Sequence, residues 1–164
     1  MPFELRINLS EIDAFADKLY EFEGAVQAEQ IYAMEAGISV LEQAITVRTP
    51  VNFGTARQAW THQITGTPAN LLGEVFNPLE YALPLELGRR PGKQPPTSAI
   101  ELWVTRKLGL SGSEARNTAY LIARAIGRRG TQGAFMLRDG WAEAEPIIIR
   151  LFEAIPEKAM ARLQ

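Results

Sequence analysis

Two acidic residues, Glu80 and Glu86, are the first side chains whose spacing invites a catalytic interpretation. A carboxylate pair can act as acid and base on a glycosidic bond when roughly 5–10 Å separate its members. Residues 81–87 alternate apolar and other side chains, which predicts a strand. Six residues along a strand span about 20 Å, so the two carboxylates are too far apart to act on one bond. We expect no acid–base pair here.

The sequence contains one histidine and no cysteine, which removes most other catalytic centres and metal sites. His62 has no acidic residue beside it in the sequence and no G-x-S-x-G serine motif, so we interpret it as a core or surface histidine. The stretch GRRGTQG, residues 127–133, follows a predicted helix, whereas the glycines of a phosphate-binding loop precede one. From these residues we assign no catalytic residue, metal site or cofactor site.

Basic side chains gather in two glycine-rich stretches, residues 88–96 and 127–133, and on the predicted helices beside them. Residues 89–138 carry ten basic and two acidic side chains, while residues 1–45 carry nine acidic and two basic ones. The protein should thus have an acidic and a basic territory. We expect the basic territory to form a protein interface that contains Arg89, Arg90, Lys93, Gln94, Arg106, Lys107, Arg124, Arg128 and Arg129.

Two other interpretations of the basic residues remain open, a solvated face and a surface for nucleic-acid phosphates. The isoelectric point of about 5.5 is low for a dedicated nucleic-acid binder, and the basic loops lack aromatic residues on which bases could stack. An acidic protein surface is therefore the partner that we expect. The acidic first helix of another copy offers such a surface, and copies joined in this way close into a ring if the rotation permits.

A long helix is predicted from Ser10, as its cap, to Pro50. Apolar residues recur with helical spacing at Ile12, Phe15, Leu19, Phe22, Val26, Ile31, Met34, Ile38, Leu41 and Ile45. Gly24 and Gly37 each cost about 1 kcal/mol relative to alanine, so a kink or break is allowed near Gly24. We expect residues 31–45 of this stripe to pack on Ile64, Val75 and Leu83 or Leu85.

After a short helical piece at residues 56–60, three strands are predicted at residues 61–65, 71–76 and 81–87. Pro84 cannot donate to a ladder, so the third strand should lie at an edge. Residues 88–96 are predicted to be a loop without ladder partners, and this loop and residues 127–133 are expected to be mobile in an isolated subunit.

Three further helices complete the prediction. Thr97 should cap a helix that ends at Gly109, and Ser113 should cap the next, which carries Ala119, Leu121, Ile122, Ala125 and Ile126 and ends at Gly127. The last runs over residues 139–163 and bends or restarts at Pro156. The whole predicts an α+β fold, one domain over residues 1–164, with a long N-terminal helix packed on a small antiparallel sheet and further helices in the C-terminal half.

The N-terminal sequence MPFELRINLSEID lacks the apolar core of a signal peptide, and no apolar run approaches the roughly 20 residues that span a bilayer. We expect a cytoplasmic protein with no membrane contact.

Two motifs and their order carry a family resemblance. Pro50, Asn52, Gly54, Arg57 and Trp60 fall along a pattern P-x-D-T-G-x-L-x-x-S/A-W, with Asn in place of Asp and the threonine displaced to Thr55. Asn77, Tyr81, Ala82, Glu86 and Gly88 match N-x-x-x-Y-A-x-x-x-E-x-G. The basic stretch IARAIGRRGT follows at residues 122–131. From about residue 37 onward, the chain resembles the tail-component family of long-tailed bacteriophages and prophages, the neck or tail-completion proteins. The first forty residues depart most from the family.

The resemblance implies a structural virion protein of the neck that completes the tail end and joins tail to head, without catalytic residues or cofactor. Its implied partners are further copies in a ring, expected to be hexameric, head-side connector or adaptor proteins, tail terminator or tail tube proteins, and DNA in the ring lumen. The implied location is the virion, after assembly in the host bacterial cytoplasm. The alternative is a nucleic-acid-binding module that uses the basic loops, and a third class is an enzyme whose site the sequence does not show.

Overall fold

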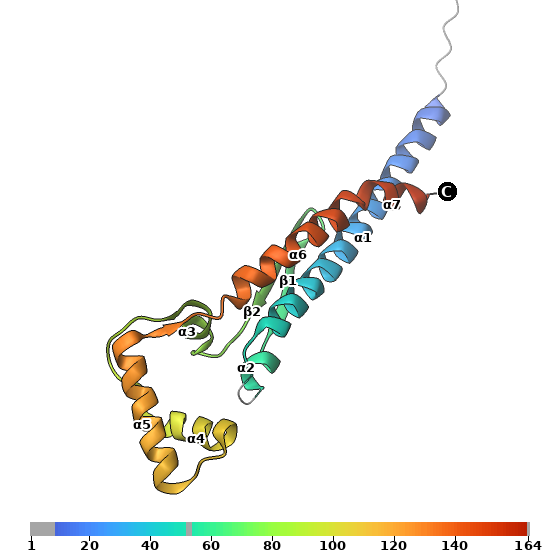
Figure 1. Cartoon of the computed structure of the whole chain (residues 1–164). Coiled ribbons are helices and arrows are strands. Elements are labelled where there is room, and N and C mark those ends of the chain that lie inside the picture. The colour runs from blue at the N-terminus through green and yellow to red at the C-terminus, as the bar shows by residue number, and fades with distance from the viewer. Residues whose placement is uncertain (1–8, 52–53, 164) are drawn as a thin grey trace, which may run out of the picture. The chain divides into compact units, whose positions relative to one another are not determined.

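The computed structural model describes residues 9–51 and 54–163, and their contacts form two compact units (Figure 1). Of the described residues, unit 1 contains residues 9–43, 62–75 and 142–163. Unit 2 contains residues 44–51, 54–61 and 76–141. The predicted α+β class is confirmed, with a long N-terminal helix, a two-stranded antiparallel hairpin and further helices in the C-terminal half.

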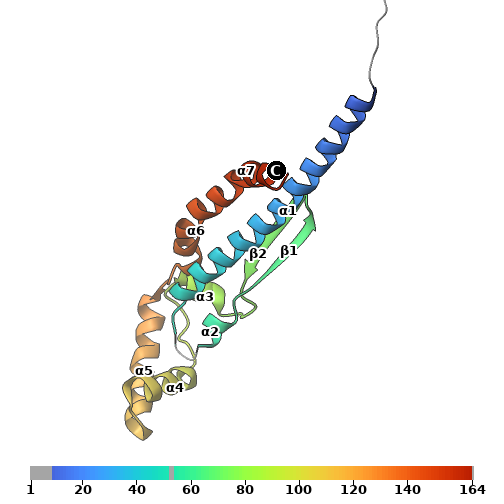
Figure 2. The same ribbon diagram turned by 90° about the vertical axis from the view of Figure 1, so that its right-hand side faces the viewer.

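Unit 1 is built around the long helix α1, Leu9–Arg48, which continues without a break through Gly24 and Gly37. Ser10 lies inside this helix and is therefore not its cap. Strands β1, Thr61–Thr67, and β2, Asn70–Phe76, form a hairpin on one side of α1. Helices α6, Met136–Glu153, and α7, Ile155–Ala161, follow its other side (Figure 2). Pro156 stands in the first turn of α7, as the predicted restart requires.

Small residues bring the elements of unit 1 together. Ala33, Ala144 and Ala159 are buried, and a Cβ placed on Gly37 would lie 3.5 Å from the Ile148 side chain of α6. A Cβ on Gly73 of β2 would lie 2.7 Å from Met34 Sδ and 3.0 Å from Ile38 Cδ1. The predicted packing of Met34 and Ile38 on the sheet is thus confirmed, and Gly73 is what allows the close approach.

Unit 2 contains the short helices α2, Thr55–Gln58, and α3, Ala82–Leu87, and the helix pair α4, Thr97–Leu108, and α5, Gly112–Arg129. Val104, Ala115 and Ala119 form a buried cluster between α4 and α5. Ile100, Trp103, Leu110 and Ile122 surround it. Gly109 ends α4 in the left-handed conformation, as predicted.

The ends of these helices differ from the prediction. The N-cap positions are Pro96 for α4 and Ser111 for α5, so Thr97 and Ser113 lie inside the helices they were expected to cap. Helix α5 continues past Gly127 to Arg129, and α6 begins at Met136, before residue 139. Leu121 and Ala125 are exposed, because the inward face of α5 is formed by Ala115, Ala119 and Ala123.

The prediction of a third meander strand at residues 81–87 was wrong, because Ala82–Leu87 is the helix α3. Asn77 Oδ1 accepts the N–H of Leu79 at 3.2 Å and Ala82 N–H bonds to Leu79 O at 2.9 Å, which turns the chain into the helix. Pro84 falls in the first helical turn, where no intrahelical partner for its nitrogen is needed. The alternating apolar pattern therefore did not mark a sheet face, and Leu83 and Leu85 pack in no sheet with Ile64 and Val75.

Candidate functional site

All nine residues of the predicted interface are exposed, and all belong to unit 2. We call them the basic surface: Arg89, Arg90, Lys93, Gln94, Arg106, Lys107, Arg124, Arg128 and Arg129. The structure divides them into two groups. Residues 89–94 lie with Arg128 and Arg129 at the C-terminal end of α5, and Arg124 stands one helical turn before. Arg106 and Lys107 end α4 and lie near the start of α5, roughly 25 Å away along that helix.

The first group is held together by a small sheet that the sequence did not predict. Strand β3, Gly88–Arg89, pairs antiparallel with β4, Thr131–Gln132, so that Arg89 lies opposite Thr131. Glycines allow the two backbones to meet. A Cβ on Gly88 would lie 2.3 Å from Thr131 O, and one on Gly130 would lie 2.0 Å from Arg89 O. Both glycines also have a positive φ, of 77° and 73°.

The rest of the loop at residues 90–96 is anchored to the end of α5. Gly92 N–H donates to Gly127 O at 2.8 Å, and a Cβ on Gly127 would lie 3.3 Å from Gln94 Cα. Arg89 Nη2 donates to Lys93 O at 2.6 Å and closes the loop. The expectation of a loop without ladder partners was therefore wrong, because the two glycine-rich stretches supply partners to each other. The mobility predicted for both stretches in an isolated subunit stays a prediction, but a lack of ladder partners no longer supports it.

Glu86 connects this sheet to the start of α6. Its side chain is buried, with 6% of its surface exposed, and its carboxylate accepts the N–H of Leu137 at 2.8 Å and of Arg138 at 3.2 Å. These N–H groups belong to the first turn of the helix, where partial positive charge favours a carboxylate. Glu86 O also accepts Phe135 N–H at 3.1 Å. A buried helix cap, and not half of a catalytic pair, is the structural role of Glu86.

Arg138 and Asp139 form an exposed ion pair beside this cap, with 2.8 Å between Arg138 Nε and Asp139 Oδ1. The hydrogen bond from Arg138 lowers the pKa of Asp139 below its ordinary value, and the same bond raises the pKa of Arg138. The guanidinium of Arg138 also lies 4.0 Å from the centre of the Phe135 ring. Phe135 takes a positive φ of 50° at the residue before α6.

Other residues of the two motifs fix the turn that follows α1. Thr49 is fully buried, and its Oγ1 accepts Trp60 Nε1–H at 2.7 Å. Arg57 Nη2 donates to the carbonyls of Val47 at 3.1 Å and Thr49 at 3.0 Å, which otherwise lack helical partners. Asn77 Nδ2 donates to Ala56 O at 2.8 Å. The described motif residues thus stabilise the fold of unit 2, while Asn52 lies outside the described residues.

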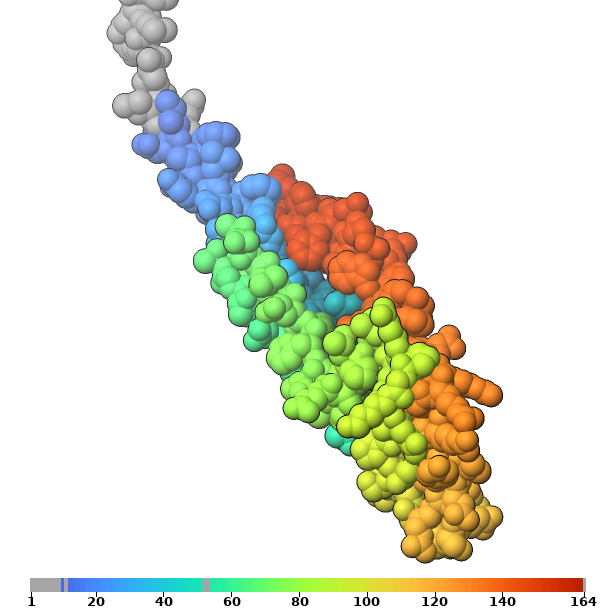
Figure 3. All heavy atoms as spheres, turned by 90° about the vertical axis from the view of Figure 1, so that its left-hand side faces the viewer, coloured from blue at the N-terminus to red at the C-terminus, as the bar shows by residue number. Residues whose placement is uncertain are grey.

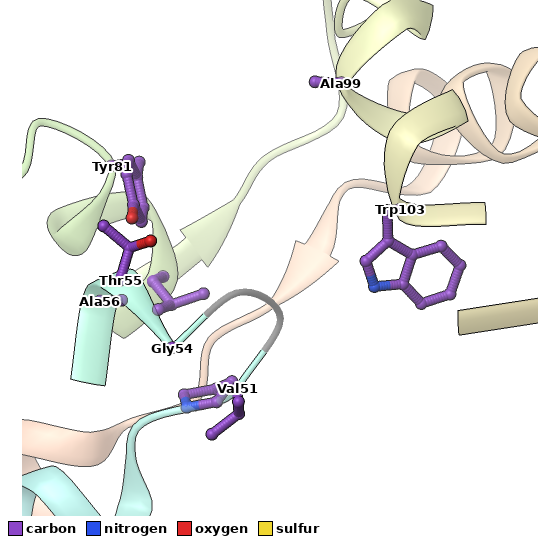
Figure 4. Close-up of a pocket in the computed structure, with 9 residues that line it drawn as sticks. Val51, Gly54, Thr55, Ala56, Tyr81, Ala99 and Trp103 are labelled. Carbon is purple, nitrogen blue, oxygen red and sulfur yellow. The ribbon is translucent and has the colours of Figure 1, made fainter. Parts of the chain in front are cut away.

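A cavity of about 580 Å³ lies within unit 2 (Figure 4). Tyr81 and Thr55 line one side and Trp103 lies on the other, and most of the lining side chains are apolar. Its wall includes Val51 and Gly54, which flank residues 52 and 53, and these two lie outside the described residues. The cavity contains no cluster of charged side chains, and we assign it no ligand.

Within unit 1, His62 has an acidic partner that the local sequence does not show. Its Nδ1 contacts Glu42 Oε2, and both side chains are partly exposed. Over residues 9–51 and 54–163, no group of three or more His, Asp or Glu side chains is arranged to hold a metal ion. None of the helices in this part of the chain is long and apolar enough to cross a membrane.

Comparisons of the chain with protein-family models, with curated proteins and with solved structures gave no match.

Proposed function

We propose that this protein is a structural component of a bacteriophage neck, which completes the tail end and joins tail to head, and that it is not an enzyme. The order of motifs in the sequence supports the proposal. Their described residues, among them Arg57, Trp60, Asn77 and Glu86, serve the fold of unit 2, as expected when a family shares a scaffold. What the scaffold presents outward is the basic surface.

The observation that carries the proposal is the exposure of all nine side chains of the basic surface, together with a loop whose backbone is held at Gly88, Arg89 and Gly92 by residues 127–132. Exposed charges contribute little to folding, so their concentration on one unit is better explained by a partner than by stability. Positive charge of this kind steers association with an acidic surface and sets its register. We propose that this surface contacts neighbouring proteins in the assembled neck.

The proposed partners are further copies in a ring, expected to be hexameric, head-side connector or adaptor proteins, and tail terminator or tail tube proteins. The proposed location is the virion, after assembly in the bacterial cytoplasm. Arginines of the basic surface that face a ring lumen would contact DNA.

Disruption of the gene in the phage or prophage that encodes the chain tests the proposal. We expect DNA-filled heads and separate tails in electron micrographs, and restored particles when the wild-type gene is supplied in trans. The triple variant Arg89→Ala, Arg90→Ala and Lys93→Ala should fold but fail to restore joining. Arg150→Ala, an exposed basic residue of unit 1, is the matched control and should restore it. Joined, infectious particles without the protein would overturn the proposal.

The alternative function, a nucleic-acid-binding module, is favoured by the same exposed basic residues. It predicts that the purified protein binds random duplex DNA by itself, with an affinity that falls steeply as salt rises. Micromolar binding at near-physiological salt, abolished in the triple variant, would favour this function. Binding only to protein neighbours would favour the neck.

A further inference from the structure

The first turns of α1 present an apolar stripe that nothing in the described chain covers. Between residues 29 and 37, the same face of α1 is buried by the C-terminal helices. Arg162 Nε bonds to Glu29 Oε1 at 2.5 Å, Ala33 is buried, and the Ile148 side chain lies 3.5 Å from where a Cβ on Gly37 would stand. Towards the N-terminus the covering ends, and the blue turns of α1 project past the red helix α7 (Figure 3).

Three large apolar side chains stand on this projecting part: Ile12, Phe15 and Leu19, with 56%, 63% and 52% of their surface exposed. Their spacing of three and four places them on one face, in line with the half-buried Phe22 and with Ala33. An apolar stripe of this length on a solvated helix marks an interaction site. We call residues 12–23 of α1 the acidic stripe, because Asp13, Asp17, Glu21 and Glu23 outweigh Lys18 and give a net charge of −3.

The outer face of α5 has the opposite character. Ala115, Ala119 and Ala123 face inward and are buried, so the side chains about half a turn away point outward. On that face Tyr120 and Leu121 are more than half exposed, and Arg124 and Arg128 follow one and two turns later. Helix α5 carries four arginines and one glutamate, a net charge of +3. It is therefore apolar and basic where the acidic stripe is apolar and acidic.

We propose that the acidic stripe of one copy docks on the outer face of α5 in a second copy. The contact would cover Phe15 and Leu19 with Tyr120 and Leu121, and would set the arginines of α5 against the carboxylates of α1. This inference rests on the proposed self-assembly and deepens it, because it names the two surfaces. It places most of the binding energy on the helix faces and assigns the loop of residues 89–94 to other neighbours.

Charge distinguishes this pairing from the simplest alternative, a coiled coil of two α1 helices. Such a pair would bring two stripes of net charge −3 together, and like charges across an interface are unfavourable. The pairing of α1 with α5 uses two different surfaces, so after the first contact one copy keeps a free α5 face and the other keeps a free acidic stripe. A heterologous contact of this kind continues into a closed ring or an open filament.

Reciprocal charge reversal tests the pairing. One variant carries Asp13→Lys, Asp17→Lys and Glu21→Lys, and the other carries Arg116→Glu, Arg124→Glu and Arg128→Glu, all at exposed positions. Each variant alone should self-associate at least about tenfold more weakly than the wild type by sedimentation velocity, because its own two surfaces now have the same sign. An equimolar mixture should recover association, since each reversed surface then meets its complement.

Engineered cysteines provide a second measurement, because the chain has none of its own. Copies with Leu19→Cys and copies with Tyr120→Cys should form a disulfide-linked dimer on mild oxidation. The control pairs Leu19→Cys with Leu72→Cys, an equally exposed residue of β2, and should not crosslink.

Several outcomes would overturn the pairing: a wild-type protein that stays monomeric at all attainable concentrations, a mixture that does not recover, or equal crosslinking in the control. Self-association that survives both the α5 reversal and the α1 reversal would indicate the coiled coil instead, because reversing α1 in both copies leaves two stripes of equal net charge. These results do not bear on the phage experiment. Heads and tails left unjoined without the gene, together with a failed mixture, would leave the neck proposal standing and remove this contact.

Discussion

The two units reach stability by different means. In unit 1, helices and a hairpin pack through small residues such as Ala33, Gly37 and Gly73, and side chains meet side chains. In unit 2, outside the α4–α5 pair, side chains of one segment bond the backbone of another, as Glu86 does at α6, and backbones meet at Gly88 and Gly130. A substitution that adds an atom at a close contact should therefore destabilise unit 2 more than unit 1, because the group that the new atom meets in unit 2 is fixed backbone.

Gly130→Ala should have the largest effect, because the new Cβ meets Arg89 O and the residue has a positive φ. We expect a loss of more than about 3 kcal/mol in the free energy of unfolding of unit 2, because the backbone of Gly130 (φ 73°, ψ −164°) lies in a region essentially restricted to glycine and the new Cβ also clashes. Gly109→Ala is the control. Its φ of 69° is similar, but its ψ of 11° is that of the left-handed helical region and nothing lies within 4 Å, so about 1–2 kcal/mol is expected.

Urea unfolding followed by tryptophan fluorescence measures this difference, because Trp60, Trp103 and Trp141 all lie in unit 2. Equal losses in the two variants would show that β3 and β4 do not approach as closely as described.

Glu86→Ala should cost about 2–3 kcal/mol, since two N–H groups of α6 lose a charged acceptor in a buried site. Glu86→Gln keeps one oxygen acceptor and should cost about 1 kcal/mol. The exposed Glu80→Gln should leave the unfolding midpoint unchanged. A Gln variant as damaging as the Ala variant would mean that the charge, and not the acceptor, holds the helix.

Gly37→Ala tests unit 1, where the partner of the glycine is a side chain. The new Cβ would be in ordinary contact with Ile148, so we expect a gain of about 0.5–1 kcal/mol from helix propensity. Gly140→Ala, inside α6 in unit 2, is the comparison. Its Cβ would lie 3.1 Å from the backbone of Ile45, so this variant should be less stable than the wild type. Thermal unfolding by circular dichroism compares both, and a destabilised Gly37 variant would contradict the packing at Ile148.

The smallest expected effect is the pH dependence of the Arg138–Asp139 pair. The pKa of Asp139 is lower in the folded than in the unfolded chain, so the pair contributes stability above the unfolded value, about 3.9. This contribution is lost as the pH falls through the lower folded pKa. Asp139→Asn should therefore be slightly less stable than the wild type at pH 7 and equal to it in acid. A difference that persists in acid would mean that the carboxylate charge is not its cause.

The comparison of the units also explains which parts of the fold could be predicted. Helical spacing predicted α1 and the contact of Met34 and Ile38 with the sheet, because those residues interact through their own periodic face. The alternation at residues 81–87 predicted a strand where α3 lies, because that segment is fixed by Asn77 and by the partners of Glu86, which are about fifty residues away. No local pattern shows such a partner.

In the candidate site, the exposure of the side chains could be predicted, but the backbone pairing that holds them together could not. Exposure of the nine basic residues follows from their type, and all nine are exposed. That residues 88–89 and 131–132 pair with each other could not be predicted, because two residues are too few for a periodic signal. Leu121 was one of the apolar residues of the helix predicted after Ser113, whereas the alanines of α5 form its buried face and leave Leu121 exposed.

The segment order of the units has a consequence for synthesis on the ribosome. Gly37 and the Ile148 side chain that faces it are about 110 residues apart, and at about 5–20 residues per second a ribosome needs roughly 5–20 s to translate this distance. During that interval the hairpin can already pack on α1 and unit 2 can fold, but the face of α1 that α6 will cover stays open to solvent. The nascent chain thus carries an uncovered apolar helix face until the segment after residue 141 is made, and apolar surface exposed in this way favours aggregation during synthesis.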